Sequence, residues 1–279
     1  MQATVAAAER SAYAVPQARA PHPRTPEAPR PAPLRPQRPA IAPREDARPL
    51  RHHCFICQLR QSWLAADPFR STGAQPWLVS GRKMIERGQA LFRAGDPLRH
   101  LYVVHTGQFK SCTTAADGRT QVTGFHVSGE MLGLDGVGMG SHASDAIALE
   151  DAQVCTIAYT ELLQMVGSSS SLQEQFWQIM GGQINRDHQV MLWLGSLKAE
   201  ERVASFLVNL LSRLHAIGFS ASALVLRMTR EEIGSYLGLS LETVSRSFSH
   251  FKQLKLVDVK ERDLRVLDHG GLARLACKA

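Results

Sequence analysis

The 279-residue sequence predicts an α+β protein with an antiparallel β-roll of jelly-roll type, one long helix and a C-terminal winged helix-turn-helix. Three observations predict this fold. Short apolar runs separated by glycines fill residues 80–164, as in antiparallel rolls and barrels. A heptad-spaced apolar stripe follows in residues 171–197. Two short helix patterns joined by Gly-Leu-Ser, and then a strand-turn-strand pattern, complete the chain.

Composition and charge limit the classes of function. Hydrophobic residues make up 44% of the chain and charged residues 20%, which is typical of a globular protein with a sizeable core. The net charge of +7 favours an anionic partner. No run approaches about 18 apolar residues, and Glu9 and Arg10 interrupt the Ala-rich start early. We therefore expect no membrane segment and no secretory signal, and hence a cytoplasmic protein.

Proline and charge divide the chain into four predicted parts: 1–50, 51–167, 168–197 and 198–279. Residues 1–50 hold 11 of the 14 prolines with 8 arginines and 4 acidic residues, which predicts a disordered tail that is solvated or makes a weak anionic contact. The second part carries two cysteines and then the roll, and the third is the long helix. The last part has 13 basic and 9 acidic residues, so the basic surplus of the folded chain lies there.

The roll is predicted from strand-like runs and the turns between them. Leu101–Val104 and Val122–Phe125 are rich in β-branched and aromatic residues. Turns are indicated by Gly88, Gly95, Gly107, Gly118 and Gly129. Such a roll encloses an interior that holds either a small ligand or only its own side chains.

The long helix carries a stripe whose members are spaced 3, 4, 3, 4 and 3 residues apart: Trp177, Met180, Ile184, Asp187, Met191 and Leu194. This spacing predicts a helix that pairs with its own copy in a homodimer; the alternative is a helix packed on its own domain. In a parallel pair, Asp187 would face the second Asp187, and two close carboxylates repel each other. We expect Asp187 to hold the dimer near balance, unless it lies solvated at the outer edge of the stripe.

Local signals define the helix-turn-helix. Thr229 and Glu232 form a capping box, Gly238 ends the first helix and Ser240 caps the second. The apolar stripe of the second helix consists of Leu241, Val244, Phe248 and Phe251. A hairpin wing is then predicted from the two apolar runs Lys255–Val259 and Leu264–Leu267.

Five stretches between residues 88 and 239 form a set of motifs: GQALFRAGD from Gly88, LYVVHTG from Leu101, TGFHVSGE from Thr123, AEERVASF from Ala199 and MTREEIGSYLGL from Met228. Together with Glu242-Thr-Val-Ser-Arg246, they resemble the CRP/FNR family of bacterial transcription regulators, and its FNR branch closely. The resemblance covers roughly residues 52–277. It implies a sensor roll, a dimerisation helix, a DNA-binding winged helix-turn-helix and RNA polymerase as a partner in activation.

Three side chains on the polar face of the second helix are expected to contact double-stranded DNA. Arg246 can donate two hydrogen bonds to guanine, Glu242 can accept one from cytosine, and Ser245 suits either base type. The resemblance implies that these positions recognise a TTGAT half-site. A two-fold dimer then predicts a palindrome with half-sites about one helical turn apart. The alternative is that these residues only solvate the helix surface.

The roll is expected to bind no cyclic nucleotide. In the members of the family that do, an arginine of the roll holds the cyclic phosphate. Here no Lys or Arg occurs from residue 120 to residue 185, and the stretch after the glycine-rich loop 129–140 offers Asp145 instead. A buried phosphate without a cationic partner would be costly.

The FNR branch holds an oxygen-labile 4Fe-4S cluster on four cysteines, of which three form a C-x2-C-x5-C pattern. Cys54 and Cys57 match the first pair, and Cys155 matches the distant ligand in the roll. Trp63 stands at the third position, and no cysteine lies between residues 57 and 112. A complete site therefore needs a substitute ligand, for which the candidates are His52, His53, Asp67 and, less suitably, Cys112.

Three interpretations of the cysteines stay open. They form an iron–sulfur site closed by a non-cysteine ligand, they act as a thiol–disulfide switch or bind another metal, or the input lies elsewhere. That other input includes nitric oxide through a haem at His126 or His142. A thiol oxidoreductase built on Cys54 and Cys57 would need a βαβ context that is missing. No Walker motif, nucleophile elbow or paired-carboxylate spacing occurs, so we expect a regulator that responds to oxygen or redox state and not an enzyme.

Overall fold

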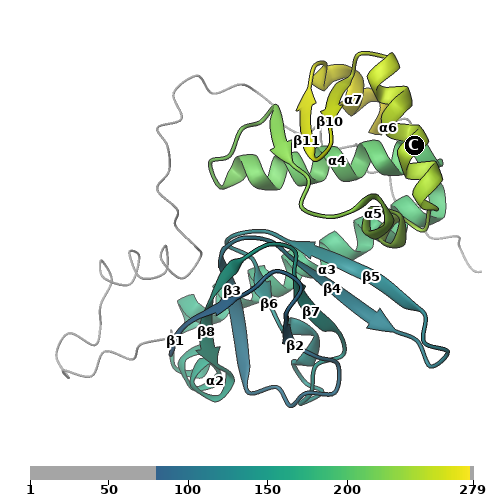
Figure 1. Cartoon of the computed structure of the whole chain (residues 1–279). Helices are drawn as coiled ribbons and strands as arrows, with labels where there is room; N and C mark the ends of the chain where they lie inside the picture. The colour runs from purple at the N-terminus through teal and green to yellow at the C-terminus, as the bar shows by residue number, and fades with distance from the viewer. Residues whose placement is uncertain (1–79, 277–279) are drawn as a thin grey trace, which may run out of the picture. The chain divides into compact units, whose positions relative to one another are not determined.

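The computed structural model describes residues 80–276 (Figure 1). Several predictions concern residues outside this range: the tail 1–50, Cys54, Cys57, Cys277, the position of Trp63, and the substitute ligands His52, His53 and Asp67. In Figure 1 the strands of the roll run from blue to teal, and the helix-turn-helix with its wing runs from green to yellow.

The predicted antiparallel roll consists of two four-stranded sheets. The first has the order β1 (Gly81–Ile85), β8 (Ala152–Ala158), β3 (His100–Thr106) and β6 (Met131–Leu132). The second has the order β2 (Ala90–Phe92), β7 (Asp145–Ala148), β4 (Phe109–Thr114) and β5 (Thr120–His126). A short 3₁₀ helix, η1 (Leu134–Gly136), lies in the loop between β6 and β7. Every strand pair is antiparallel, which confirms the predicted architecture.

The central strands β3 and β8 bury both of their faces. Val104 and Val154 point into the roll interior with Phe92 and Phe109, where they form one apolar cluster. Their neighbours along the chain, Val103 and Cys155, point the other way into a second cluster. Successive side chains of a strand alternate between faces, so the adjacent apolar residues in these strands serve two cores.

The turn after β3 requires glycine. Gly107 has a φ of 85°, in the left-handed region that side chains disfavour. A Cβ there would lie 2.6 Å from Cβ of Ala152, so the close approach of β8 also excludes a side chain. The sequence prediction of a turn at this position is confirmed.

Two helices follow the roll, α2 (Tyr159–Ser168) and the 27-residue α3 (Ser170–Ser196). The hydroxyl of Ser169 accepts a hydrogen bond from the backbone N–H of Leu172 and caps α3. Leu172 and Phe176 are buried, whereas Trp177, Ile184, Met191, Leu192 and Leu194 are exposed. The predicted helix is confirmed within a few residues. Four apolar members of its stripe are exposed, whereas Met180 is partly buried against the cluster that contains Cys155. Helix α2 was not predicted.

The C-terminal part contains the predicted helix-turn-helix and wing. Its elements are α4 (Ala199–Ala216), β9 (Ala223–Val225), α5 (Arg230–Leu237), α6 (Leu241–Gln253), β10 (Val257–Lys260), β11 (Asp263–Val266) and α7 (His269–Ala276). The wing has three strands in the order β10-β11-β9, because β9 pairs with β11. The sequence predicted a two-stranded hairpin and missed both β9 and α7.

Local chemistry explains where α5 and α6 begin and end. The backbone N–H of Glu232 donates to the hydroxyl of Thr229 at 3.1 Å, and the Glu232 carboxylate accepts from the N–H of Thr229 at 2.6 Å. Gly238 ends α5 with a φ of 63°, and the Ser240 hydroxyl accepts from the N–H of Thr243 at 3.2 Å. These three predictions are confirmed. One member of the predicted apolar stripe is wrong. Leu241 is 46% exposed, and the stripe is buried from Val244 onward.

Candidate nucleic-acid interface and sensing site

The first two turns of α6 present the three predicted DNA-contacting residues. Val244, Phe248 and Phe251 bury the opposite face of the helix in the core. Glu242 and Arg246 are exposed, and Ser245 is half-buried. Because the apolar face is anchored, the side chains on the other face are held outward on a rigid element.

Neighbouring groups set the state of the exposed side chains. The guanidinium of Arg246 donates to the Thr243 hydroxyl at 3.4 Å. A backbone hydrogen bond at the helix start, the Ser240 side chain and the nearby Arg246 together lower the pKa of Glu242. Glu242 is therefore an ionised hydrogen-bond acceptor at neutral pH, beside a cationic donor.

A cation–π contact joins the two helices of the motif. The guanidinium carbon of Arg230, at the start of α5, lies 3.5 Å from the ring centroid of Phe248 in α6. Burial lowers the pKa of Arg230. Such a contact contributes about 0.5–2 kcal/mol, and it joins the supporting helix to the helix that carries Arg246.

In the roll, carboxylates occupy the loop that follows the glycine-rich stretch. One oxygen of Asp135 accepts hydrogen bonds from the backbone N–H groups of Ala143 and Ser144, at 3.0 and 2.8 Å, and from the Ser144 hydroxyl at 2.7 Å. Asp145 accepts from the N–H of Ala94 at 2.8 Å. These backbone N–H groups and this hydroxyl therefore already donate to the protein's own carboxylates.

Aromatic rings fill part of the same side of the roll. The imidazole of His142 is buried and stacks on Phe92 with 3.7 Å between ring centroids. Tyr102 also stacks on Phe92, with 5.9 Å between the ring centroids. The three stacked rings therefore lie beside the loop whose N–H groups, at Ala143 and Ser144, donate to Asp135.

The described cysteines lie in two separate cores. Cys155 is 2% exposed and packs with Leu162 of α2 and Phe176 of α3. Cys112 is buried in β4 within the cluster that includes the helix-turn-helix, and burial raises the pKa of its thiol. The structure does not bring Cys112 to Cys155, so it does not support Cys112 as a substitute ligand.

Within residues 80–276 no group of three or more His, Cys, Asp or Glu side chains is placed to hold a metal ion. Of the three cysteines predicted as cluster ligands, this range contains Cys155. The other predicted ligands, Cys54, Cys57, His52, His53 and Asp67, lie outside the described residues.

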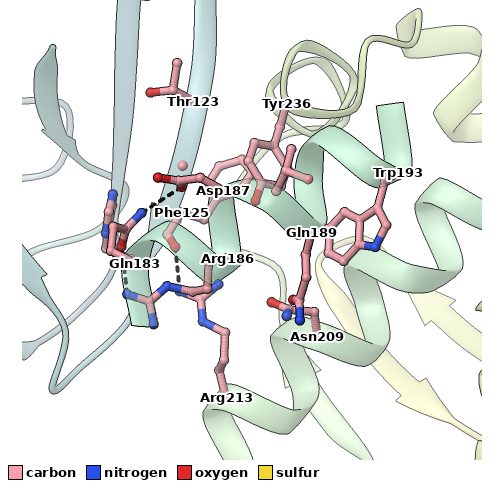
Figure 2. Close-up of a pocket in the computed structure, with 13 residues that line it drawn as sticks. Thr123, Phe125, Gln183, Arg186, Asp187, Gln189, Trp193, Asn209, Arg213 and Tyr236 are labelled. Atoms are coloured by element: carbon pink, nitrogen blue, oxygen red, sulfur yellow. Dashed lines mark hydrogen bonds between the residues drawn. The ribbon is translucent and has the colours of Figure 1, made fainter. Parts of the chain in front are cut away.

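Asp187 lies on α3 at the border between the exposed stripe and a small polar cleft (Figure 2). Its side chain is exposed, and one carboxylate oxygen accepts from the Gln183 amide at 2.9 Å. With about 100° per residue, Asp187 is rotated about 60° from Ile184 at the centre of the stripe. This position suits both interpretations of Asp187, the facing pair and the solvated edge.

Comparisons with known proteins agree with this geometry. Residues 82–169 match the model of the cyclic nucleotide-binding domain, and residues 201–275 match that of the Crp-like helix-turn-helix domain. The transcriptional regulatory protein btr of Bordetella pertussis is 42% identical over 80% of this chain and 93% of its own. The fumarate and nitrate reduction regulatory protein of Escherichia coli is 40% identical over 71% and 80%. The structure of FixK2 from Bradyrhizobium japonicum has a TM-score of 0.67 at 30% identity, over 72% of this chain and 100% of that one.

The chain belongs to the CRP/FNR family of transcription regulators. Regulators of this family bind DNA and act as dimers, and they are not enzymes. The predictions of the family, its FNR branch and the fold class are confirmed. Among residues 80–276 of this regulator, no helix has the length and apolar character needed to span a membrane.

The regulator has an ion pair that the sequence did not indicate. Arg213 of α4 donates from Nε and Nη2 to the two carboxylate oxygens of Glu130, at 2.9 and 2.5 Å. Its Nη2 also donates to the backbone oxygen of Phe125 at 2.5 Å (Figure 2). Both side chains are less than one-fifth exposed. Burial alone would raise the pKa of Glu130, but the charge and hydrogen bonds of Arg213 outweigh it, so the pKa is lowered.

Further polar contacts join strands β4 and β5 to α5. The ammonium group of Lys110 lies 2.7 Å from the Glu232 carboxylate, the same group that completes the capping box. The hydroxyl of Ser235 accepts from the backbone N–H of Val122 at 2.9 Å, and the Gln121 amide donates to the Ser235 carbonyl. Residues of the roll thus bind the first helix of the DNA-binding motif directly.

Proposed function

We propose that this chain is an FNR-type regulator that binds a TTGAT-type palindrome as a homodimer through Glu242, Ser245 and Arg246. The observation that carries the proposal is the position of these side chains at the exposed start of α6. The ionised Glu242 and the adjacent Arg246 offer one acceptor and one bidentate donor, which suit a C·G or G·C pair. Activation through RNA polymerase is part of the proposal and rests on the resemblance to the FNR branch.

The test of the DNA interface is the variant Arg246→Ala. Its affinity for the palindrome should fall by about 1–3 kcal/mol and its affinity for random DNA much less, because a base contact is lost and not a phosphate contact. Arg119→Ala, which removes an exposed arginine of the roll, is the matched control and should change neither affinity. Equal losses of Arg246→Ala on both DNAs would contradict a base-reading role.

We further propose that oxygen or redox state is the input and that Cys54, Cys57 and Cys155 sense it. The support is the position of the Cys155 thiol, which is buried in one cluster with Phe176 of α3. A chemical change at this sulfur would alter the packing of the dimerisation helix. A 4Fe-4S cluster, when bound, would supply an oxygen-labile centre there. A thiol–disulfide switch and a haem input are the alternative chemistries.

Cysteine variants test the sensing proposal. Cys54→Ser, Cys57→Ser and Cys155→Ser should each abolish the change in DNA affinity on exposure to air, whereas Cys277→Ser should preserve it. A normal response in all three variants would contradict the proposal.

An absorption spectrum of the anaerobic protein, with iron and sulfide analysis, distinguishes the chemistries. A brown colour bleached by air indicates a cluster, and a Soret band indicates haem. Trp63→Cys should raise the iron content if a vacant ligand position limits cluster binding.

The proposed regulator does not use a cyclic nucleotide, although residues 82–169 match a domain of that name. The hydrogen bonds of Asp135 to Ala143 and Ser144, and the absence of Lys and Arg from 120 to 185, support this. A phosphate would meet carboxylates in place of a cation. Calorimetric titration with cyclic AMP and cyclic GMP should show no binding; micromolar binding of either would contradict the proposal.

A further inference from the structure

A groove of about 600 Å³ lies between the roll and the wing. Three turns of the roll line it, at Gln108, Ser128 and Glu150. The strands of the wing and the loop after α4 line its other side. Sites that hold a small molecule have volumes of about 300–1,000 Å³, whereas the cleft in Figure 2, at about 20 Å³, has room for about one water molecule. The groove is therefore large enough for an organic ligand.

Strand pairing determines which side chains of the wing border the groove. Successive side chains of a strand alternate between faces, and one set packs into the apolar cluster beneath the wing. The other set forms two rows across the sheet: Asp258, Arg265 and Ala223 in the first, and Lys260, Asp263 and Val225 in the second. Arg265 belongs to β11, the middle strand, and is therefore at the centre of its row.

Two carboxylates of the groove already have cations beside them. One carboxylate oxygen of Glu150 lies 3.0 Å from Nε of Arg227. Asp258 lies 3.1 Å from the ammonium group of Lys252, which does not line the groove. The hydrogen bond from Lys252 is the main reason why the pKa of Asp258 is lowered. Neither carboxylate therefore depends on Arg265 for its counter-charge.

The third carboxylate of the groove, Asp263, lies directly across from Lys260, so opposite charges adjoin at the end of the hairpin. Arg265, in contrast, has neither an ion pair nor a side-chain hydrogen bond within residues 80–276. Its guanidinium is exposed, and its planar set of donors is unused. The groove thus has one positive charge that no carboxylate of the described residues balances.

Exposed apolar surface lies next to this cation. Ala223 is paired in register with Arg265, and Val225, two residues further along β9, is 39% exposed. Phe219 lies in the loop that leads to β9, lines the same groove and is 47% exposed. A few polar groups that converge beside an apolar wall are typical of a small-molecule site.

We propose that this groove binds a small amphipathic anion, an organic carboxylate with an aliphatic or aromatic body. The carboxylate accepts two parallel hydrogen bonds from Arg265, because its geometry matches the guanidinium fork. The body covers Ala223, Val225 and Phe219 and removes their apolar surface from water. The proposal is independent of the TTGAT palindrome, the homodimer and the oxygen input.

The phosphate backbone of DNA is the competing occupant, because Arg265 and Lys260 are cations on the wing. A phosphate contact would not require the apolar wall at Phe219. It would make Arg265→Gln weaken the binding of random DNA and reduce the salt slope of that binding by about one. An amphipathic ligand instead predicts an affinity that depends on both Arg265 and Phe219.

The first experiment titrates the full-length protein with sodium octanoate by calorimetry. Octanoate should bind at a single site per chain with a Kd below about 1 mM. Each buried CH2 group should strengthen binding about two- to fourfold, so decanoate should bind more tightly than octanoate, and hexanoate more weakly. Octanamide, which has the same body without the charge, should bind about tenfold more weakly than octanoate. No saturable binding, or equal affinities for octanoate and octanamide, would overturn the proposal.

The second experiment repeats the octanoate titration with variants of the groove. Arg265→Gln and Phe219→Ser should each weaken binding about fivefold. Arg262→Gln and Leu267→Ser are the matched controls and should bind as the wild type does, because both residues are exposed and neither lines the groove. The urea midpoint shows that each variant is folded, and the first experiment decides the proposal without any variant. An unchanged octanoate affinity in Arg265→Gln, or an effect of this variant confined to random DNA, would overturn the proposal in favour of a DNA contact.

Discussion

The start of α6 and the cluster around Arg213 use charged side chains in opposite ways. In α6, Glu242 and Arg246 are exposed on an anchored helix and have few partners within the chain. Around Arg213, the guanidinium and the Glu130 carboxylate are mostly buried and neutralise each other. Charges that point outward with unused hydrogen-bonding capacity indicate a site for a partner, whereas charges satisfied internally stabilise an arrangement of the protein itself.

The loop around Asp135 belongs to the second kind. Its backbone donors and hydroxyl donate to the protein's own carboxylate, although it lies in the stretch that matches the model of the cyclic nucleotide-binding domain. A fold does not by itself imply a ligand: the chain matches the domain, and we propose that it binds no cyclic nucleotide because these donors are occupied.

The largest effect is expected from breaking the buried pair. Glu130→Gln leaves the Arg213 guanidinium buried without its counter-charge, so the free energy of unfolding should fall by about 3–5 kcal/mol. Urea unfolding at pH 7 measures this. Asp117→Asn, which breaks the exposed pair with Arg119, should cost under about 1 kcal/mol. Similar losses in the two variants would remove the distinction between inward and outward charges.

The pH dependence of stability sharpens the same contrast. Burial, chiefly, lowers the pKa of His126 from 6.5 to about 4. The unfolded chain therefore binds the proton more readily between these values, so stability is complete above pH 6.5 and falls by about 3 kcal/mol toward pH 4. His126→Gln should flatten this part of the profile, measured by urea unfolding from pH 4 to pH 7. His188→Gln, on the exposed side of α3, should leave the slope as in the wild type.

A smaller effect is expected at Asp187, an exposed carboxylate that also accepts a hydrogen bond from Gln183 within the chain. Asp187→Ala should strengthen dimerisation by about 1–3 kcal/mol and keep DNA binding partly active in air, because the repulsion between two carboxylates is removed. Sedimentation of the aerobic protein measures the monomer–dimer constant, with Glu174→Ala as the control on the same helix. An unchanged constant, or a wild type already fully dimeric in air, would contradict the facing-pair interpretation.

Sequence reasoning succeeded where the deciding contacts are close along the chain. The capping box of α5, the end of that helix at Gly238 and the cap at Ser240 each depend on residues within about four positions. The motifs of the FNR branch extended this local information to the whole described chain. Helix α2, strand β9 and the exposure of Leu241 were missed, because each depends on which surface the segment meets.

The sequence by itself determined the family, the order of the elements and the polar face of α6, because strand alternation, helix periodicity and capping are set by neighbouring residues. Only the tertiary structure decided that Glu130 pairs with Arg213 and Lys110 with Glu232, which are 83 and 122 positions apart. It also decided that Cys112 and Cys155 belong to different cores and that the two halves of α3 pack on different clusters. Such pairings arise from the close packing of distant segments, and no local pattern encodes them.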